Sequence, residues 1–215
     1  MKCVIIAGGE LVPTPRINRI LKSGELIVCA DGGARHLRSL DIQPHVLMGD
    51  FDSIHRDDLA FLIEKEVEII EFPARKDLTD TELCVEWAID QNVNEVVLLG
   101  AIGSRMDHTL ANIFLLKKLA DKGIFGRVIN ANNELLVIHD RIRDQITLNG
   151  KKGEILSILP LSRTVTGITL EGFEYPLSEA RIEMGSSLGI SNCFARERVR
   201  IRIRKGILLV SRSKD

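Results

Sequence analysis

The sequence predicts an α/β N-terminal domain, residues 1–132, followed by a C-terminal antiparallel β-sandwich, residues 133–215. Two observations lead to this fold class. In the N-terminal part, short apolar runs alternate with amphipathic helical patterns, which is typical of a mostly parallel sheet covered by helices on both faces. In the C-terminal part, the helical period disappears, and short alternating segments are separated by Gly and Pro, as in an antiparallel sandwich.

The N-terminal strands are expected where a short run is largely apolar, because strands buried on both faces lack alternation. Five such runs occur, at residues 3–7, 25–30, 45–48, 67–72 and 95–100. Around them, apolar residues recur at helical spacing and predict helices. These helices are expected around residues 14–22, 34–41, 56–65, 80–91 and 108–121. In the last helix, the residues predicted to belong to the core are Leu110, Ile113, Phe114 and Leu116.

The C-terminal strands are expected in six alternating segments. They are residues 134–138, 144–150, 154–161, 164–173, 180–185 and 198–211. A stripe with arginine at every second position runs from Arg196 to Arg204. This stripe could contact nucleic acid, but a strand with one solvated face and an arginine-guarded edge explains it more simply.

The overall composition indicates a globular protein without bulk attraction to polyanions or membranes. Its 29 Lys and Arg residues against 30 Asp and Glu residues give a net charge of -1. No stretch approaches 18 apolar residues, and the N-terminus lacks the pattern of a signal peptide. The four cysteines lie far apart and form no CxxC pair, which favours reduced thiols. We therefore expect a cytoplasmic protein with no nucleic-acid partner and no membrane partner.

Four motifs of the N-terminal domain follow predicted strands, at the edge of a parallel sheet where ligands gather. The first is Asp31-Gly32-Gly33, whose glycines permit a tight turn with amides close to a phosphate group. An ordinary strand-to-helix turn with an Asp cap explains these residues equally well.

The second motif places Asp50 and Asp52 on either side of a phenylalanine, directly after a strand. Adjacent carboxylates repel each other unless a cation or several donors compensate. His55 and Arg56 could serve, but a divalent ion fits better. Carboxylate oxygens without nearby His or Cys ligands favour Mg²⁺ over zinc.

The third motif contains Asp77 and Asp80, at the start of a predicted helix. Thr79 and Glu82 fit a capping box there, so Asp80 could simply complement the helix dipole, an effect worth about 0.3–1 kcal/mol. Because these carboxylates also follow a strand, we expect the acidic residues of both loops to converge on one metal ion.

The fourth motif runs from Ser104 to His108. Ser104 or Asp107 could cap the following helix, and Arg105 offers a forked cation suited to phosphate. His108 could act as an acid or base, although a lone histidine at a helix start more often bonds to a loop.

One polar loop stands out in the C-terminal domain. Ser191, Asn192 and Phe194 could bind a flat heteroaromatic ring through hydrogen bonds and an aromatic wall, although a plain loop would look similar. The chain contains neither a GxxxxGK[ST] P-loop nor a GxGxxG motif, so any nucleotide site must be built differently.

Taken in order, the motifs DGGA, GDFDS, DLTD, GSRMDH and SLGISN resemble those of the thiamine pyrophosphokinase family, also called thiamine diphosphokinase. The resemblance implies an N-terminal domain that binds ATP and Mg²⁺ and a C-terminal domain that binds thiamine. It also implies a homodimer with active sites between the subunits. The implied reaction moves the diphosphate group of ATP to the hydroxyl of thiamine, giving thiamine diphosphate and AMP.

The resemblance also implies roles for individual residues. The metal ligands would be Asp50, Asp52 and Asp80. The catalytic residues would be Asp31, Asp50, Asp52, Asp77 and Asp80. The ATP-binding residues would be Asp31, Gly32, Gly33, Ser104, Arg105, Asp107 and His108. The thiamine-binding residues would be Ser191, Asn192 and Phe194.

Two other functions remain open on the residues alone. One is another Mg-dependent diphosphokinase or a nucleotidyl transferase that acts on a different alcohol. The other is a non-catalytic regulatory module that binds a nucleotide or a vitamin.

Overall fold

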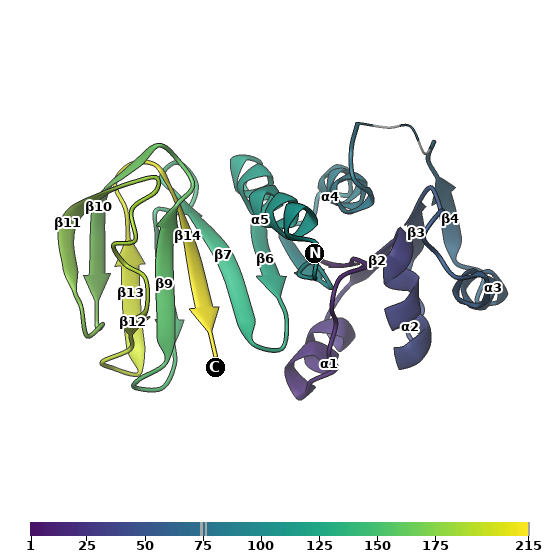
Figure 1. Cartoon of the computed structure of the whole chain (residues 1–215), viewed down its shortest axis with the longest axis horizontal. Helices are drawn as coiled ribbons and strands as arrows, with labels where there is room; N and C mark the ends of the chain where they lie inside the picture. The colour runs from purple at the N-terminus through teal and green to yellow at the C-terminus, as the bar shows by residue number, and fades with distance from the viewer. Residues whose placement is uncertain (74, 76, 215) are drawn as a thin grey trace. The chain divides into compact units, whose positions relative to one another are not determined.

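The computed structural model describes residues 1–73, 75 and 77–214, and the chain divides into two compact units, Met1–Ala131 and Asn132–Asp215. The boundary expected from the sequence lies one residue further along the chain. Each unit has its own strands and its own buried residues (Figure 1).

The N-terminal unit contains six parallel strands in the order β6-β5-β1-β2-β3-β4. Their bounds are β1 Lys2–Ile6, β2 Leu26–Ala30, β3 Val46–Gly49, β4 Glu68–Glu71, β5 Glu95–Leu99 and β6 Phe125–Ile129. The connections from β1 to β4 run toward one edge of the sheet, whereas β5 and β6 lie on the other side of β1. The order of strands therefore reverses between β1 and β5, and the carboxyl ends of these strands form the crevice where ligands bind in such sheets.

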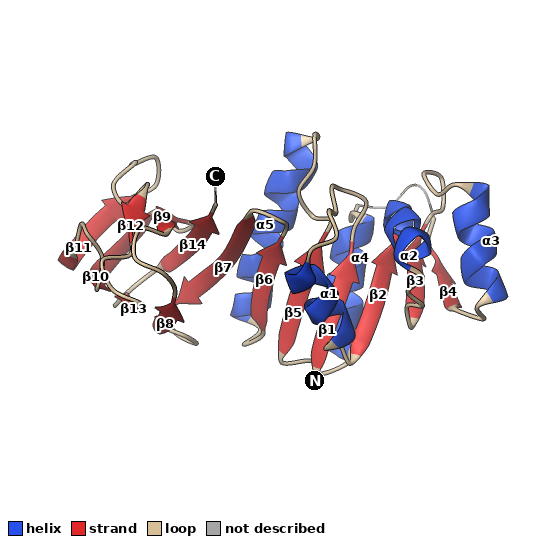
Figure 2. Cartoon of the chain, turned by 90° about the horizontal axis from the view of Figure 1, so that it is seen from below, coloured by secondary structure: helices blue, strands red, loops and turns tan. Residues whose placement is uncertain are grey.

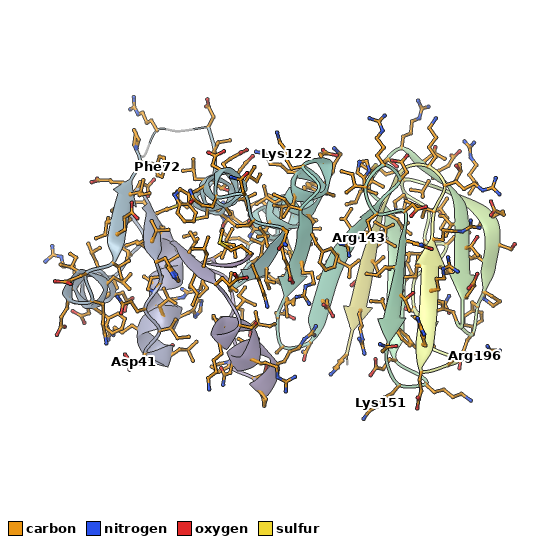
Figure 3. All side chains as sticks on the ribbon, turned by 180° about the vertical axis from the view of Figure 1, so that it is seen from behind. Asp41, Phe72, Lys122, Arg143, Lys151 and Arg196 are labelled. Atoms are coloured by element: carbon orange, nitrogen blue, oxygen red, sulfur yellow. The ribbon has the colours of Figure 1, made fainter. Side chains whose placement is uncertain are left out.

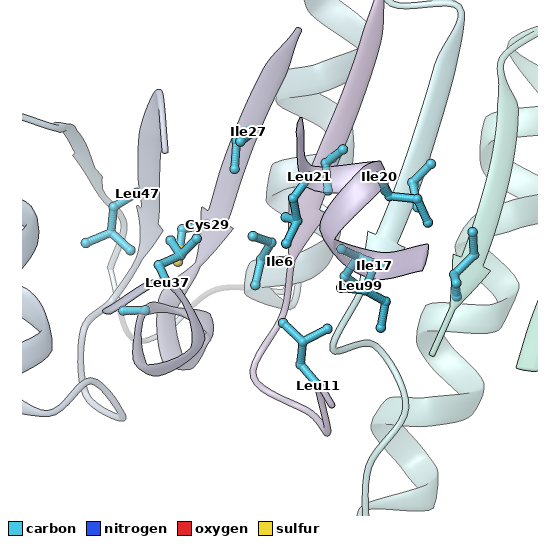
Figure 4. Packing of buried hydrophobic residues seen from close by; sticks show 14 of the residues in the cluster. Ile6, Leu11, Ile17, Ile20, Leu21, Ile27, Cys29, Leu37, Leu47 and Leu99 are labelled. Atoms are coloured by element: carbon cyan, nitrogen blue, oxygen red, sulfur yellow. The ribbon is translucent and has the colours of Figure 1, made fainter. Parts of the chain in front are cut away.

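In the described part of this unit, five α-helices cover the two faces of the sheet. They are α1 Pro15–Lys22, α2 Ala34–Leu40, α3 Arg56–Glu64, α4 Asp80–Asp90 and α5 Met106–Asp121. Figure 2 shows α1 and α2 on one face and α4 and α5 on the other. On the first face, Ile17, Ile20 and Leu21 of α1 pack with Ile6 and Leu99 of the sheet (Figure 4).

Strand β6 is the element of this unit that the sequence analysis missed. Its apolar pattern is interrupted by Gly126 and Arg127. A Cβ atom at Gly126 would lie only 2.8 Å from Leu119 Cδ1, so the glycine lets α5 pack closely on the strand. Arg127 is tolerated because its guanidinium pairs with Glu95 on the neighbouring strand.

The buried face of α5 differs from the prediction. Leu116 is buried as expected, but Leu110 and Phe114 are 46% and 56% exposed. The buried positions are instead Thr109, Asn112, Leu115, Leu116, Leu119 and Ala120. Two of these residues are polar, so a prediction based on the spacing of hydrophobic residues did not identify the face of α5 that is buried.

In the C-terminal unit, the described strands pair antiparallel in two groups of four, in the orders β12-β9-β14-β7 and β11-β10-β13-β8. The strands are β7 Asn133–His139, β8 Gln145–Asn149, β9 Ile155–Pro160, β10 Thr164–Glu171, β11 Leu177–Glu183, β12 Asn192–Cys193, β13 Arg198–Arg202 and β14 Ile207–Ser213. The expected sandwich is confirmed, with Phe173 after β10 and Phe194 after β12 packing edge to face at 5.6 Å between ring centroids.

The arginine stripe lies on β13, but this strand is not an edge strand. It pairs with both β8 and β10, so the prediction of an arginine-guarded edge was wrong. The solvated face is present, because Val199 and Ile201 are buried while Arg198 and Arg200 are exposed. Figure 3 shows Arg196, which precedes the strand, at the surface of this unit.

In the described part of the chain, no helix has the length and apolar character needed to cross a membrane.

Candidate active site

Asp31 lies at the centre of the site, where β2 ends and a short 3₁₀ turn, Asp31–Gly33, leads into α2. Its backbone φ of 30° lies in the left-handed region, and the residue is only 4% exposed. Ser53 Oγ donates a hydrogen bond to Asp31 Oδ2. Asp31 Oδ1 is buried and has no hydrogen-bond partner among the described residues. A buried carboxylate oxygen without a donor is costly, and a bound cation would offset this cost.

Three carboxylates converge at this point. One oxygen each from Asp31, Asp50 and Asp52 lies within 4.8 Å of the others. Phe51, between the two loop aspartates, has a φ of 60°, so the GDFDS loop turns sharply where it leaves β3. The Asp52 amide donates a long 3.4 Å hydrogen bond to Asp50 Oδ1. The loop thus brings both of its carboxylates beside Asp31.

The electrostatics of Asp31 reflect this crowding. Burial raises the pKa of the Asp31 carboxyl, and the negative charges of Asp80, Asp50 and Asp52 raise it further. The Ser53 hydrogen bond opposes this shift in pKa. A divalent cation would relieve both the repulsion and the unpaired oxygen, and carboxylate oxygens are the ligands that Mg²⁺ prefers. The residues present therefore fit such an ion.

The carboxylates that cluster in the structure are not the same three that the sequence analysis expected to bind the metal ion. The clustered carboxylates are Asp31, Asp50 and Asp52, whereas the sequence analysis expected Asp80 in place of Asp31. Asp80 is the first residue of α4 and is near enough to raise the pKa of Asp31, but it is outside this cluster. Asp77 is exposed and also outside the cluster.

The cap of α4 explains part of this third motif locally. Thr79 Oγ1 accepts a hydrogen bond of 3.2 Å from the Glu82 amide, as the capping box predicts. The Glu82 side chain does not complete the box, because it pairs with Lys118 Nζ at 2.8 Å. Asp80 therefore has the helix-dipole role as well as its proximity to Asp31.

A cavity of about 540 Å³ opens beside Asp31, within the N-terminal unit. Loops after β1, β2 and β5 and the starts of α4 and α5 line it. The glycines among the lining residues are Gly8, Gly9, Gly32, Gly100 and Gly103. At Gly9, a Cβ atom would lie 2.4 Å from the Gly100 carbonyl oxygen, so glycine is required where these two loops meet. The cavity lies where the strand order reverses, which is the expected ligand site of an open parallel sheet.

The fourth motif contributes to this cavity in part. Ser104, Arg105 and His108 line it, whereas Asp107 pairs with Arg105 at 2.6 Å between Nη2 and Oδ2. The hydrogen bond from Arg105 lowers the pKa of Asp107 to about 2. The prediction that Ser104 or Asp107 caps α5 was wrong, since Arg105 occupies the N-cap position and no side chain bonds there.

The three residues predicted to bind thiamine differ in their exposure to solvent. Ser191 is exposed and has a φ of 55°. Asn192 is 3% exposed. Its side-chain Oδ1 accepts a hydrogen bond from the backbone N–H of Tyr175 at 3.1 Å, and its Nδ2 donates to the Tyr175 carbonyl at 2.7 Å. Phe194 has no exposed surface, so the expected aromatic wall at Phe194 does not agree with the structure. Tyr175, whose backbone bonds to the Asn192 side chain, is 67% exposed.

Two family models match the chain, one in each unit. The model of the thiamin pyrophosphokinase catalytic domain matches residues 17–125, and the model of its vitamin B1 binding domain matches residues 143–208. The chain belongs to the thiamine pyrophosphokinase family.

Individual members of the thiamine pyrophosphokinase family match over nearly the whole chain. The thiamine pyrophosphokinase of Bacillus subtilis strain 168 is 32% identical over 98% of both chains. The crystal structure of thiamine pyrophosphokinase from Bacillus subtilis, at 30% identity, superposes with a TM-score of 0.89 and covers 100% of each chain. The enzyme structure from Geobacillus thermodenitrificans, at 33% identity, has a TM-score of 0.85 and covers 100% of this chain and 98% of that one.

Several residues of this candidate site were missed by the sequence analysis. Arg35 and His36 hold the Gly8–Gly9 loop through its carbonyl groups, with His36 Nε2 2.8 Å from the Gly9 oxygen. Asn112 Nδ2 donates to the Ala101 carbonyl at 2.8 Å and fixes the loop after β5. The sequence contained one signal for this part of the site. Gly8 and Gly9 directly follow the first apolar run, at a strand end where ligands gather.

Proposed function

We propose that this member of the thiamine pyrophosphokinase family transfers the diphosphate group of ATP to the hydroxyl of thiamine, giving thiamine diphosphate and AMP. The observation that carries the proposal is Asp31 Oδ1, which has no partner within residues 1–73, 75 and 77–214 and lies in a carboxylate cluster beside a glycine-lined cavity. The vitamin B1 binding model that matches the C-terminal unit supports thiamine as the acceptor.

The bond changes of this reaction define what the residues must do. The thiamine hydroxyl oxygen forms a bond to the β-phosphorus, and the bond from that phosphorus to the oxygen bridging to the α-phosphate breaks. The bridging oxygen leaves with AMP, and the hydroxyl proton is released. Because phosphoryl transfer passes through a loose transition state, positioning and charge neutralisation contribute more than a strong base.

Asp31, Asp50 and Asp52 are the residues proposed to hold the metal ion. When bound, Mg²⁺ neutralises charge on phosphate oxygens and orients them for displacement. Ser53 donates to Asp31 Oδ2, and Oδ1 has no hydrogen-bond partner in the described part of the chain. We propose that Asp80, at the cavity wall, orients the reacting groups at the edge of this cluster.

The cavity is the proposed ATP site. Amides of Gly32 and neighbouring loop glycines can approach phosphate oxygens without steric hindrance from side chains. Ser104, Arg105 and His108 also line the cavity and complete the proposed nucleotide contacts. Asp107 acts through its pair with Arg105. Asp77 is exposed, and its proposed role is that of an acidic residue at the periphery of the site.

On the thiamine side, the proposal uses Ser191 as the exposed polar residue and assigns Asn192 to holding the loop. The homodimer with shared active sites, implied by the family resemblance, is also part of the proposal and is tested by analytical ultracentrifugation. A cytoplasmic location is proposed with it, supported by four cysteines that form no disulfide.

Product analysis tests the function directly. The protein is incubated with ATP, Mg²⁺ and thiamine, and the products are separated by ion-exchange chromatography. Thiamine diphosphate and AMP in equal amounts support the proposal. Release of pyrophosphate would instead indicate a nucleotidyl transferase, and diphosphorylation of a different alcohol would indicate another diphosphokinase. Binding of ATP and thiamine without any turnover would indicate a regulatory module.

A further inference from the structure

Among the described residues, two arginines line the cavity, and their partners differ. Arg105 forms an ion pair with Asp107, so its charge is largely balanced within the chain. Arg35 contacts backbone carbonyls and His36 but no carboxylate among the described residues. Arg35 therefore keeps its full positive charge at the cavity wall.

The guanidinium of Arg35 is held in place by its own contacts. Its Nη2 atom donates to the carbonyl of Gly8 and, at 3.0 Å, to that of Gly9. These bonds employ one of the two terminal nitrogens. Nη1 and its N–H groups have no partner among the described residues and are free to donate to a ligand.

The charges around the cavity explain why such a cation is needed. Asp31 and Asp80 both line the cavity, and a triphosphate placed there meets these carboxylates. A planar guanidinium that is already oriented loses little rotamer freedom when it binds phosphate oxygens, and its charge-assisted hydrogen bonds are strong.

We propose that Arg35 binds the phosphate chain of ATP directly, as well as holding the Gly8–Gly9 loop. This assignment rests on the proposed function, in which the cavity takes ATP. It makes Arg35 a specificity residue for the triphosphate, distinct from the residues that hold the metal ion.

Equilibrium binding of a nucleotide series tests this role. Adenosine, AMP, ADP and ATP are titrated by calorimetry at fixed Mg²⁺ and without thiamine, using wild-type protein, Arg35→Gln and Arg35→Lys. We expect Arg35→Gln to weaken ATP binding by about 10- to 100-fold, the range of a lost charge-assisted hydrogen bond, and to change adenosine binding less than twofold. The affinity of Arg35→Lys for ATP should lie between those of the wild type and Arg35→Gln.

Arg19→Gln is the matched control, because Arg19 is an exposed arginine on α1 outside the cavity lining. It should bind every nucleotide like the wild type. Equal weakening of ATP and adenosine by Arg35→Gln would show that the residue only supports the loop and would overturn the proposal. Unchanged ATP binding would overturn it too.

The same titrations separate this inference from the proposed function. A wild-type protein that binds ATP but forms no thiamine diphosphate contradicts the proposed reaction, while the Arg35 comparison stays valid. A wild-type protein that binds no ATP overturns both.

Discussion

Gly49, the last residue of β3, packs directly against Asp31, at the end of the neighbouring strand β2. A Cβ atom built at Gly49 would lie 2.7 Å from the Cβ atom of Asp31. Real Cβ atoms do not approach so closely, so the buried carboxylate has its position only because residue 49 has no side chain. The glycine of the GDFDS motif is thus a spatial requirement of the acidic cluster.

Gly49→Ala is therefore expected to displace Asp31 and to lower both stability and activity. Overpacking of this kind typically costs about 1–3 kcal/mol of the free energy of unfolding. Urea unfolding measures the loss, and the rate of AMP formation should fall with it. Gly123→Ala is a useful comparison, because nothing lies within 4 Å of a Cβ at that position, although its φ of 77° adds local strain. Full activity in Gly49→Ala would contradict the steric argument.

Asp31→Asn is expected to stabilise the metal-free protein at neutral pH while it abolishes activity. The pKa of Asp31 is raised in the folded state, so between its ordinary value of 3.8 and the raised value the folded protein binds more protons than the unfolded chain. Stability then falls as pH increases through this window, and the full penalty is present above it. Asparagine carries no charge and tolerates a positive φ.

Thermal unfolding in EDTA between pH 3 and pH 8 measures this effect. The midpoint of Asp31→Asn should exceed that of the wild type at pH 7, and the difference should disappear toward pH 3. Added Mg²⁺ should raise the wild-type midpoint more than that of the variant. A lower midpoint for the variant at pH 7 would show that the ionised carboxylate does not destabilise the fold.

Asp52→Asn is expected to reduce turnover at least about 100-fold with the fold intact, because it removes a charged ligand from the proposed metal site. Initial rates of AMP release at several Mg²⁺ concentrations provide the measurement. Asp57→Asn serves as the control, since Asp57 is an exposed aspartate of α3 outside the cluster. If the Asp52 variant released AMP at the normal rate, the ligand assignment would fail.

Phe194→Leu tests the corrected role of the residue that the sequence analysis assigned to thiamine. Its ring is buried against Phe173, and Arg212 lies over its face at 5.6 Å from the centroid. We expect the free energy of unfolding to fall, by about 0.5–1.5 kcal/mol for the aromatic pair beyond the change in buried area. The KM for thiamine should stay within twofold of the wild type. A tenfold rise in KM at unchanged stability would restore Phe194 to the binding site.

The sequence was most informative where one local rule determined the structure. Apolar runs identified β1, β2, β3 and β5 because most of their residues are buried, and strands buried on both faces are largely apolar. The run at β4 was also identified, although this edge strand is mostly exposed. It failed where a neighbour decided the outcome. The reason for Gly126 in β6 is the adjacent Leu119, and Asn112 belongs to the buried face of α5 because it bonds to the Ala101 carbonyl.

The acidic site also combines a feature that depends on the local sequence with one that depends on a neighbouring strand. Two aspartates around one phenylalanine predicted a cation site, since charge repulsion is a local property. Which third carboxylate joins them depends on the order of strands, and β2 lies beside β3 in the sheet. This adjacency brings Asp31 into the cluster, and periodicity along the chain contains no information about it.

The burial of the cysteines makes this chain convenient to label chemically. All four cysteines lie in the described part of the chain, and Cys3, Cys29 and Cys84 are fully enclosed. Cys193 retains accessible surface, one residue from Asn192 and two from Ser191. A maleimide fluorophore should therefore attach at one place without mutagenesis, next to the segment assigned to the vitamin, and its emission could report occupancy there in real time.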